Sequence, residues 1–128
     1  MAFDRFVIDS SVFVAFYWAL DSQHEDALRV METLAGNTII IHPYVIQEVA
    51  TVLTHRLGLS VAKKFLNDIS VSKDVRLVYS DIRADIDAFT TLNAKISFTD
   101  ATLIALAKKE DAKLVTFDRQ MLSLYSKK

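Results

Sequence analysis

Four carboxylates stand where alternating strands and helices would bring distant residues together. Asp9 and Asp118 directly follow short apolar runs, and Glu48 and Asp100 lie near the starts of helical segments. If the two apolar runs form neighbouring parallel strands, all four side chains gather at the carboxyl edge of one sheet, where open α/β sheets place their ligands. Carboxylate oxygens are hard ligands that favour a divalent cation such as Mg²⁺ or Mn²⁺. The four residues are therefore candidate metal ligands.

The charge of such a cluster supports the same interpretation. Two carboxylates about 6 Å apart repel by roughly 3 kcal/mol at an effective dielectric constant of about 20. Summed over every pair among four charges, the repulsion is comparable with the ~5–15 kcal/mol that stabilises a whole domain. We therefore expect at least one carboxyl to keep its proton through a raised pKa when no metal is bound. A bound cation would turn this repulsion into ligation.

Each acid also has a purely structural interpretation. Asp9 and Asp118 can each cap the N-terminus of a following helix. Asp100 can lie in the first turn of a helix that begins after Ser97, and Glu48 can pair with a surface cation. Glu48 falls just outside the apolar arc of its helix, which predicts a half-sheltered side chain. Only the coincidence of all four acids at one edge favours a metal site.

Four β-type runs alternate with helical segments, a pattern typical of a parallel α/β sheet. The expected strands are Arg5–Asp9, Thr38–Ile41, Val75–Tyr79 and Lys113–Phe117. The expected helices are Ser11–Leu20, His24–Leu34, Pro43–Leu57, Ser60–Ile69, Ile82–Asn93, Thr99–Lys109 and Asp118–Tyr125. Pro43 suits a first helical turn, and Ser60 is placed to cap the fourth helix. We thus predict a mainly parallel sheet of four to five strands, flanked by about seven helices.

The remaining titratable residues receive structural interpretations. Asp81 is either a further acid at the sheet edge or a helix cap, and the three histidines are expected to be structural or on the surface. The other aspartates are expected to be solvated: Asp4, Asp21, Asp26, Asp68, Asp85 and Asp87.

The composition sets the class of protein. A chain of 128 residues with 52% hydrophobic and 24% charged residues predicts one ordered domain over residues 1–128. The absence of cysteine excludes disulfides and thiolate metal sites. No apolar stretch is long enough to span a bilayer, so we expect a cytoplasmic protein. A net charge of −1 gives no bulk attraction to nucleic acid, although local basic pairs such as Lys63 and Lys64 permit an RNA partner.

Short motifs surround the four acids, at Val7–Val12, Ile46–Ala50, Thr99–Ala101 and Leu114–Asp118. In this order and spacing, they resemble those of the PIN-domain nucleases, and the chain length is similar to that of the single-domain VapC toxins of prokaryotic toxin–antitoxin pairs. The resemblance implies a PIN-like α/β domain that hydrolyses RNA phosphodiester bonds with Mg²⁺ or Mn²⁺. It also implies an antitoxin partner and a homodimer.

The same resemblance suggests roles for individual residues. Asp9, Glu48, Asp100 and Asp118 would hold the metal, with Asp9 and Asp100 as the first choices for direct ligands. Ser11 and Thr116 would orient carboxylates or water around the metal. Met121 departs from the family, which usually has an aromatic residue at this position.

Other function classes remain in competition. A haloacid dehalogenase phosphatase needs a second aspartate where Ser11 stands, and a response-regulator receiver needs adjacent acids after its first strand. Neither requirement is met. The strongest alternative is a non-catalytic PIN-like module that binds RNA or a protein through the same surface.

Overall fold

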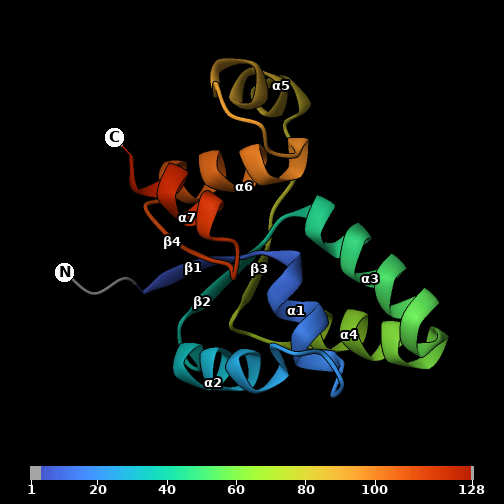
Figure 1. The fold of residues 1–128 in the computed structure, drawn as a ribbon. Coiled ribbons are helices and arrows are strands. Elements are labelled where there is room, and N and C mark those ends of the chain that lie inside the picture. The colour runs from blue at the N-terminus through green and yellow to red at the C-terminus, as the bar shows by residue number, and fades with distance from the viewer. Residues whose placement is uncertain (1–3, 128) are drawn as a thin grey trace.

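A four-stranded parallel sheet forms the centre of the molecule. The computed structural model describes residues 4–127. The strand order is β3-β2-β1-β4 (Figure 1). Val7 lies opposite Ile40 on one neighbouring strand and opposite Leu114 on the other. The strands are β1 (Arg5–Ile8), β2 (Thr38–Ile41), β3 (Val75–Leu77) and β4 (Lys113–Val115). The predicted parallel α/β sheet is confirmed, although three of the strands end one or two residues earlier than expected.

Seven helices surround the sheet in the part of the chain between residues 4 and 127. Figure 1 shows α6 and α7 on one side of the sheet, α1 and α2 on the other, and α5 packed on α6. The helices are α1 (Ser10–Tyr17), α2 (His24–Leu34), α3 (Pro43–Leu57), α4 (Leu59–Val71), α5 (Ile82–Thr91), α6 (Phe98–Lys109) and α7 (Arg119–Ser126). The predicted helices are all present, with ends that shift by up to three residues.

The two central strands carry apolar side chains on both faces of the sheet, which explains their central position. Val7 and Ile8 of β1 and Ile40 and Ile41 of β2 are each fully buried, as parallel strands covered on both faces require. Edge strand β3 is more exposed, in agreement with its less continuous apolar sequence. The sheet therefore forms a rigid base from which the loops at its carboxyl edge extend.

The junction between α3 and α4 differs from the prediction that Ser60 caps the fourth helix. Gly58 ends α3 and also stands at the N-terminus of α4, which begins at Leu59. Its φ of +100° is in the region that favours glycine. Because one residue serves both helix ends, Ser60 already lies inside α4 and forms no cap.

Two aspartates expected to be solvated are instead sheltered. Asp85 is only 8% exposed. Asp68 is half-buried and accepts a hydrogen bond of 2.6 Å from the Tyr17 hydroxyl. Both aspartates have tyrosine partners that come from distant helices, which a local sequence pattern does not reveal. Asp81 caps α5 by accepting a hydrogen bond from the Ala84 amide, so the second of its two predicted roles is observed.

No helix within residues 4–127 combines the length and the apolar character needed to cross a membrane.

Candidate metal site

Asp9 is the most enclosed of the four candidate ligands. It follows β1 directly, caps α1 through the Ser10 amide at 2.8 Å, and is only 5% exposed. Its second carboxylate oxygen, Oδ2, accepts hydrogen bonds from Thr116 at 2.7 Å and from Ser11 at 3.2 Å. Both hydroxyls thus orient Asp9, as predicted. Asp9 also caps the helix, so its structural and chemical interpretations are compatible.

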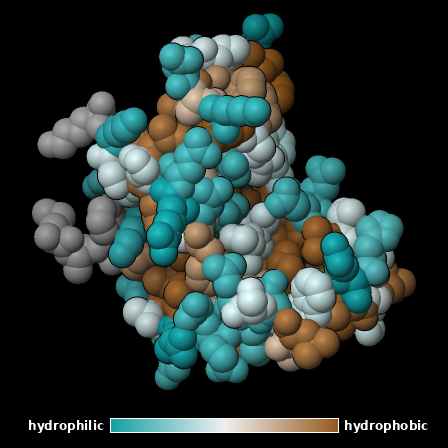
Figure 2. Space-filling model, in the orientation of Figure 1, coloured by the Kyte–Doolittle hydropathy of each residue, from teal (hydrophilic) through white to brown (hydrophobic). Residues whose placement is uncertain are grey.

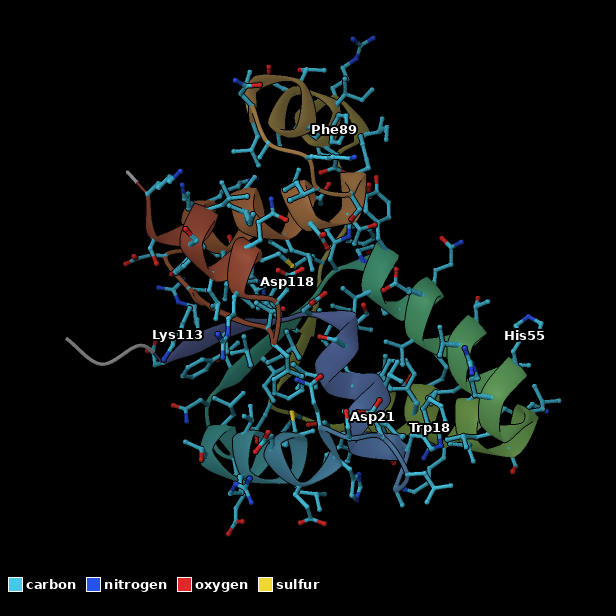
Figure 3. All side chains as sticks on the ribbon, in the orientation of Figure 1. Trp18, Asp21, His55, Phe89, Lys113 and Asp118 are labelled. Carbon is cyan, nitrogen blue, oxygen red and sulfur yellow. The ribbon has the colours of Figure 1, made fainter. Side chains whose placement is uncertain are left out.

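Thr116 connects Asp9 to Asp118 across two neighbouring strands. Its hydroxyl donates to Asp9 and accepts a hydrogen bond of 3.0 Å from the Asp118 amide. Asp118 then caps α7, because its Oδ1 accepts from the amides of Gln120 and Met121 at 2.8 and 3.1 Å. Figure 3 shows Asp118 where the chain passes from β4 into α7, close to the beginning of α1. Parallel pairing of β1 with β4 brings these two acids to one edge.

Glu48 reaches the same edge from α3. Its Oε1 accepts a hydrogen bond from the Ser10 hydroxyl, which also approaches Asp9 Oδ1 at 3.4 Å. Glu48 is exposed rather than half-sheltered as predicted. The angular position of Glu48 on α3 correctly predicted that it lies beside the apolar arc. The angle alone does not reveal that an open pocket adjoins this side of the helix. Ser10 is thus a site residue that sequence reasoning missed, although it lies in the motif around Asp9.

Asp100 lies in the first turn of α6, which Ser97 caps through the Asp100 amide at 3.0 Å. Burial raises the pKa of Asp100, and the charges of Asp9 and Asp118 add to this effect, while its hydrogen bonds with Ser97 oppose it. A raised pKa on one acid is the response expected of crowded carboxylates that lack a cation. Asp100 is therefore the acid on which burial and the charges of its neighbours act in the same direction.

We call Asp9, Glu48, Asp100 and Asp118 the acidic rim. Among residues 4–127, none of the four forms an ion pair with lysine, arginine or histidine. The same residues contain no group of three or more Asp, Glu, His or Cys side chains placed closely enough to hold a metal ion. The rim thus consists of hard oxygen donors with uncompensated charge, which fits Mg²⁺ or Mn²⁺ in chemistry, but its side chains are not drawn together into a ligand shell.

A pocket of about 460 Å³ adjoins the acidic rim at Glu48, between α3 and the start of α6. Tyr44 and Phe98 contribute aromatic walls, with ring centroids 6.0 Å apart. The polar lining comes from Gln47, Thr51 and Thr99. The rim therefore opens onto a cavity of mixed aromatic and polar character.

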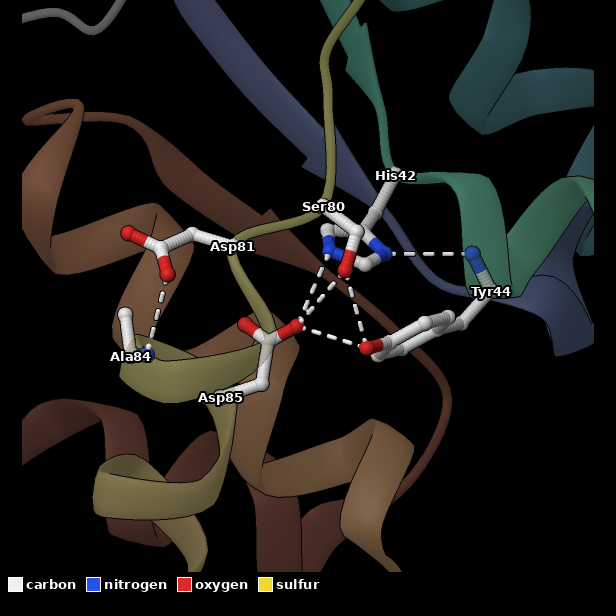
Figure 4. A network of polar contacts seen from close by, with 6 residues as sticks. All are labelled: His42, Tyr44, Ser80, Asp81, Ala84 and Asp85. Carbon is white, nitrogen blue, oxygen red and sulfur yellow. Dashed lines mark hydrogen bonds and ion pairs between the residues drawn. The ribbon is translucent and has the colours of Figure 1, made fainter.

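A polar network around buried His42 and Asp85 fixes one wall of this pocket (Figure 4). The Tyr44 hydroxyl donates to Asp85 Oδ2 at 2.7 Å and is 2.9 Å from the Ser80 hydroxyl. His42 caps α3 by accepting from the Tyr44 amide at 3.1 Å, and its Nε2 lies 3.9 Å from Asp85. Burial lowers the pKa of His42, although Asp85 acts in the opposite direction. His42 is structural, as predicted.

The other two histidines lie away from the rim. His55 is exposed at the far end of α3 (Figure 3). His24 is half-buried, and its Nδ1 lies 2.7 Å from the carbonyl oxygen of Ala15. Both positions agree with the structural or surface roles expected for them.

Comparisons with known proteins agree with this architecture. A sequence model of the PIN domain matches residues 6–127. The chain is similar to Mycobacterium tuberculosis VapC20, described as a sarcin–ricin loop cleaving toxin, with 24% identity and a TM-score of 0.80 over 92% of this chain and 93% of that chain. It is also similar to FitAcB from Neisseria gonorrhoeae, with 12% identity and a TM-score of 0.65 over 94% of this chain and 92% of that chain. No curated protein matches the sequence.

Proposed function

The chain belongs to the PIN domain family, and on that basis, together with its acidic rim, we propose that it is a metal-dependent endoribonuclease. One observation carries the proposal: the hydroxyls of Ser10 and Thr116 join Asp9 to Glu48 and to Asp118. The charges of Asp9 and Asp118 also add to the burial that raises the pKa of Asp100. A carboxyl whose pKa responds to two neighbouring carboxylates, with no basic ion-pair partner for any of the three among residues 4–127, favours a bound cation. The proposed cations are Mg²⁺ and Mn²⁺.

Asp9, Glu48, Asp100 and Asp118 would hold the metal. When bound, the metal would lower the pKa of a water molecule and offset the charge that develops on a phosphodiester. Thr116 and Ser11 hold the Asp9 carboxylate in one orientation, and Ser10 directs Glu48 toward it. Asp100 must lose its proton before it can serve as a ligand, so metal affinity should fall as the pH drops through its raised pKa.

The proposed substrate is RNA, and the proposed biological role is that of the toxin in a VapBC-type pair. VapC20 is described as a toxin that cleaves the sarcin–ricin loop, which supports this assignment by shared fold. An RNA target would place the activity in the cytoplasm. An antitoxin protein is the proposed partner.

We also propose a homodimer, which the exposed face of α5 supports. Ile82, Ile86 and Phe89 recur at helical spacing on this face and are 55%, 49% and 40% exposed. In Figure 2, apolar side chains lie among polar ones at the α5 end of the molecule. A contiguous exposed apolar stripe is typical of an interaction surface.

The central test is cleavage of single-stranded RNA with Mg²⁺ or Mn²⁺, and its loss on addition of EDTA. Mn²⁺ at a hundred times its dissociation constant should also stabilise the protein by ~2.7 kcal/mol. Glu48→Gln should weaken both effects, because it removes one ligand charge. Asp81→Asn is the matched control, since Asp81 only caps α5 and should leave both effects unchanged. Cleavage that persists in EDTA would refute the proposal.

A non-catalytic RNA- or protein-binding module remains the second candidate. It is favoured by one observation, namely that residues 4–127 hold no group of three side chains ready to bind a metal ion. RNA binding without cleavage, combined with a melting temperature that Mn²⁺ does not change, would select this alternative.

A further inference from the structure

The pocket beside Glu48 offers a set of groups that suits a nucleobase. Its lining consists of two aromatic residues, one aliphatic residue and four polar or charged ones: Tyr44, Phe98, Val52, Gln47, Glu48, Thr51 and Thr99. Two aromatic rings supply stacking surfaces, and one amide with two hydroxyls supplies donors and acceptors for a base edge. A volume of about 460 Å³ lies within the range of small-ligand sites.

The charge of the lining separates a base from other parts of a nucleic acid. Among residues 4–127, no lysine or arginine lines the pocket, and Glu48 places a carboxylate at its side. The lining itself offers a phosphate group no cation, so a phosphate would be drawn to the proposed metal at the rim rather than into the pocket. An uncharged aromatic ring needs no cation, so the pocket complements a base rather than the backbone.

The pocket wall is held in place before any ligand arrives. Asp85 is 8% exposed and receives hydrogen bonds from the Tyr44 hydroxyl at 2.7 Å and from Ser80 at 3.0 Å. On the other side, the Tyr44 ring packs against Phe98, with the two planes inclined at 48°. A stacking surface fixed in this way loses little conformational freedom when a base binds, which favours affinity.

We propose that this pocket binds one unpaired base of the RNA strand, next to the phosphodiester that the acidic rim would cleave. This inference rests on the proposed function, and it adds the site that would select which nucleotide is cut. Glu48 belongs to both the rim and the pocket lining. A base in the pocket would thus lie within one or two nucleotides of the metal site. Tyr44 and Phe98 provide the stacking, and Gln47 is positioned to read the edge of the base.

The test first locates a cleaved bond in a randomised pool of single-stranded RNA supplied with Mn²⁺. An abasic nucleotide then replaces each of the three positions on either side of that bond, and KM and kcat are measured. One position should raise KM by about 5- to 150-fold in the wild-type protein, the range for loss of one stacked base. In Phe98→Leu, the intact RNA should already show part of this rise in KM, and the same abasic change should raise KM by less than it does in the wild-type protein, because only Tyr44 still stacks on the base.

Two further variants keep the result interpretable. Tyr79→Leu removes an exposed aromatic ring that lies outside the pocket, and it should behave like the wild-type protein. Gln47→Ala lies on the exposed face of α3, so it should keep the melting temperature while changing which base is preferred at the sensitive position.

The outcomes separate the two proposals. If RNA is cut but the abasic penalties are the same in the wild-type protein, Phe98→Leu and Gln47→Ala, the pocket does not bind a base, and a partner protein becomes its best occupant. If no RNA in the pool is cut, the proposed nuclease function fails and the base site fails with it.

Discussion

The hydroxyl of Thr116 offers the sharpest test of how the acidic rim is held together. Thr116 is 8% exposed, and its hydroxyl donates to buried Asp9 while accepting from the Asp118 amide. Thr116→Val keeps the shape of the side chain and removes both hydrogen bonds. The substitution therefore isolates the polar contribution of one atom at the edge of the sheet.

The expected loss of stability follows from these two contacts. A hydrogen bond to a charged group contributes about 1.5–3 kcal/mol, and the 2.7 Å contact with a buried carboxylate belongs to this class. The Asp118 amide adds little, because Asp118 is exposed and water can replace the lost acceptor. We expect a total loss of about 2–3 kcal/mol. For a domain of this size, that corresponds to a fall in melting temperature of about 8–12 °C.

The assay is guanidinium unfolding of Thr116→Val beside Thr116→Ser, with the m-value as a check on two-state behaviour. Thr116→Ser keeps the hydroxyl and loses one methyl group, so it should cost only about 0.8 kcal/mol. Under the proposed function, Mn²⁺ affinity should also fall 10- to 100-fold in the valine variant alone. A valine variant within 0.5 kcal/mol of the wild-type protein would refute the reasoning, as would a serine variant that is equally destabilised.

Three further substitutions test other parts of the structure. The folded state raises the pKa of Asp100, so the stability of the wild-type protein should fall as the pH rises from about 3.8 through that raised pKa. Asp100→Asn should not show this fall in stability when its unfolding is measured over the same pH range. The melting temperature of Asp100→Asn at pH 7 should be equal to that of the wild-type protein or higher. Burial lowers the pKa of His42, so the stability that its neutral ring contributes should be fully present above about pH 6.5 and should be lost as the pH falls below that value. His42→Asn can still cap α3 and should reduce the difference in unfolding free energy between pH 7.5 and pH 5.5. Gly58→Ala should destabilise by about 1–2 kcal/mol in denaturant titrations, because a φ of +100° strains an L-residue even though no atom lies within 4 Å of the added methyl group; an unchanged midpoint would show that the junction between α3 and α4 relaxes without cost.

The sequence was most informative where local chemistry and burial agree. The apolar runs around Val7 and Ile40 predicted the two central strands, and Pro43 predicted the start of α3. The motifs predicted the order of the elements and placed Asp9 and Asp118 after their strands. These features depend on neighbours within a few residues or on a sheet covered on both faces, and a single sequence displays both.

What the sequence could not predict depends on contacts between distant elements. Asp85 looked like a surface acid, but Tyr44 reaches it from another helix and buries it. Ser10 was adjacent to Asp9 in the motif, yet its bond to Glu48 joins α1 to α3. The exposure of Glu48 depends on an open pocket whose other wall comes from α6. Such pairings depend on how the helices pack against one another, and the spacing of apolar residues within a single helix does not reveal this packing.

The strand order has a consequence for synthesis of the chain. β1 is made before the other three strands, yet one of its two partners in the sheet is β4, which is made after all of them. Until Lys113–Val115 has emerged and paired, Asp9 lacks Thr116 as a donor and Asp118 is not yet beside it. A growing polypeptide therefore cannot assemble the edge that carries the four acids. Any hydrolytic activity of that edge would be withheld from the translating ribosome until β4 and Thr116 have been made and have paired with β1.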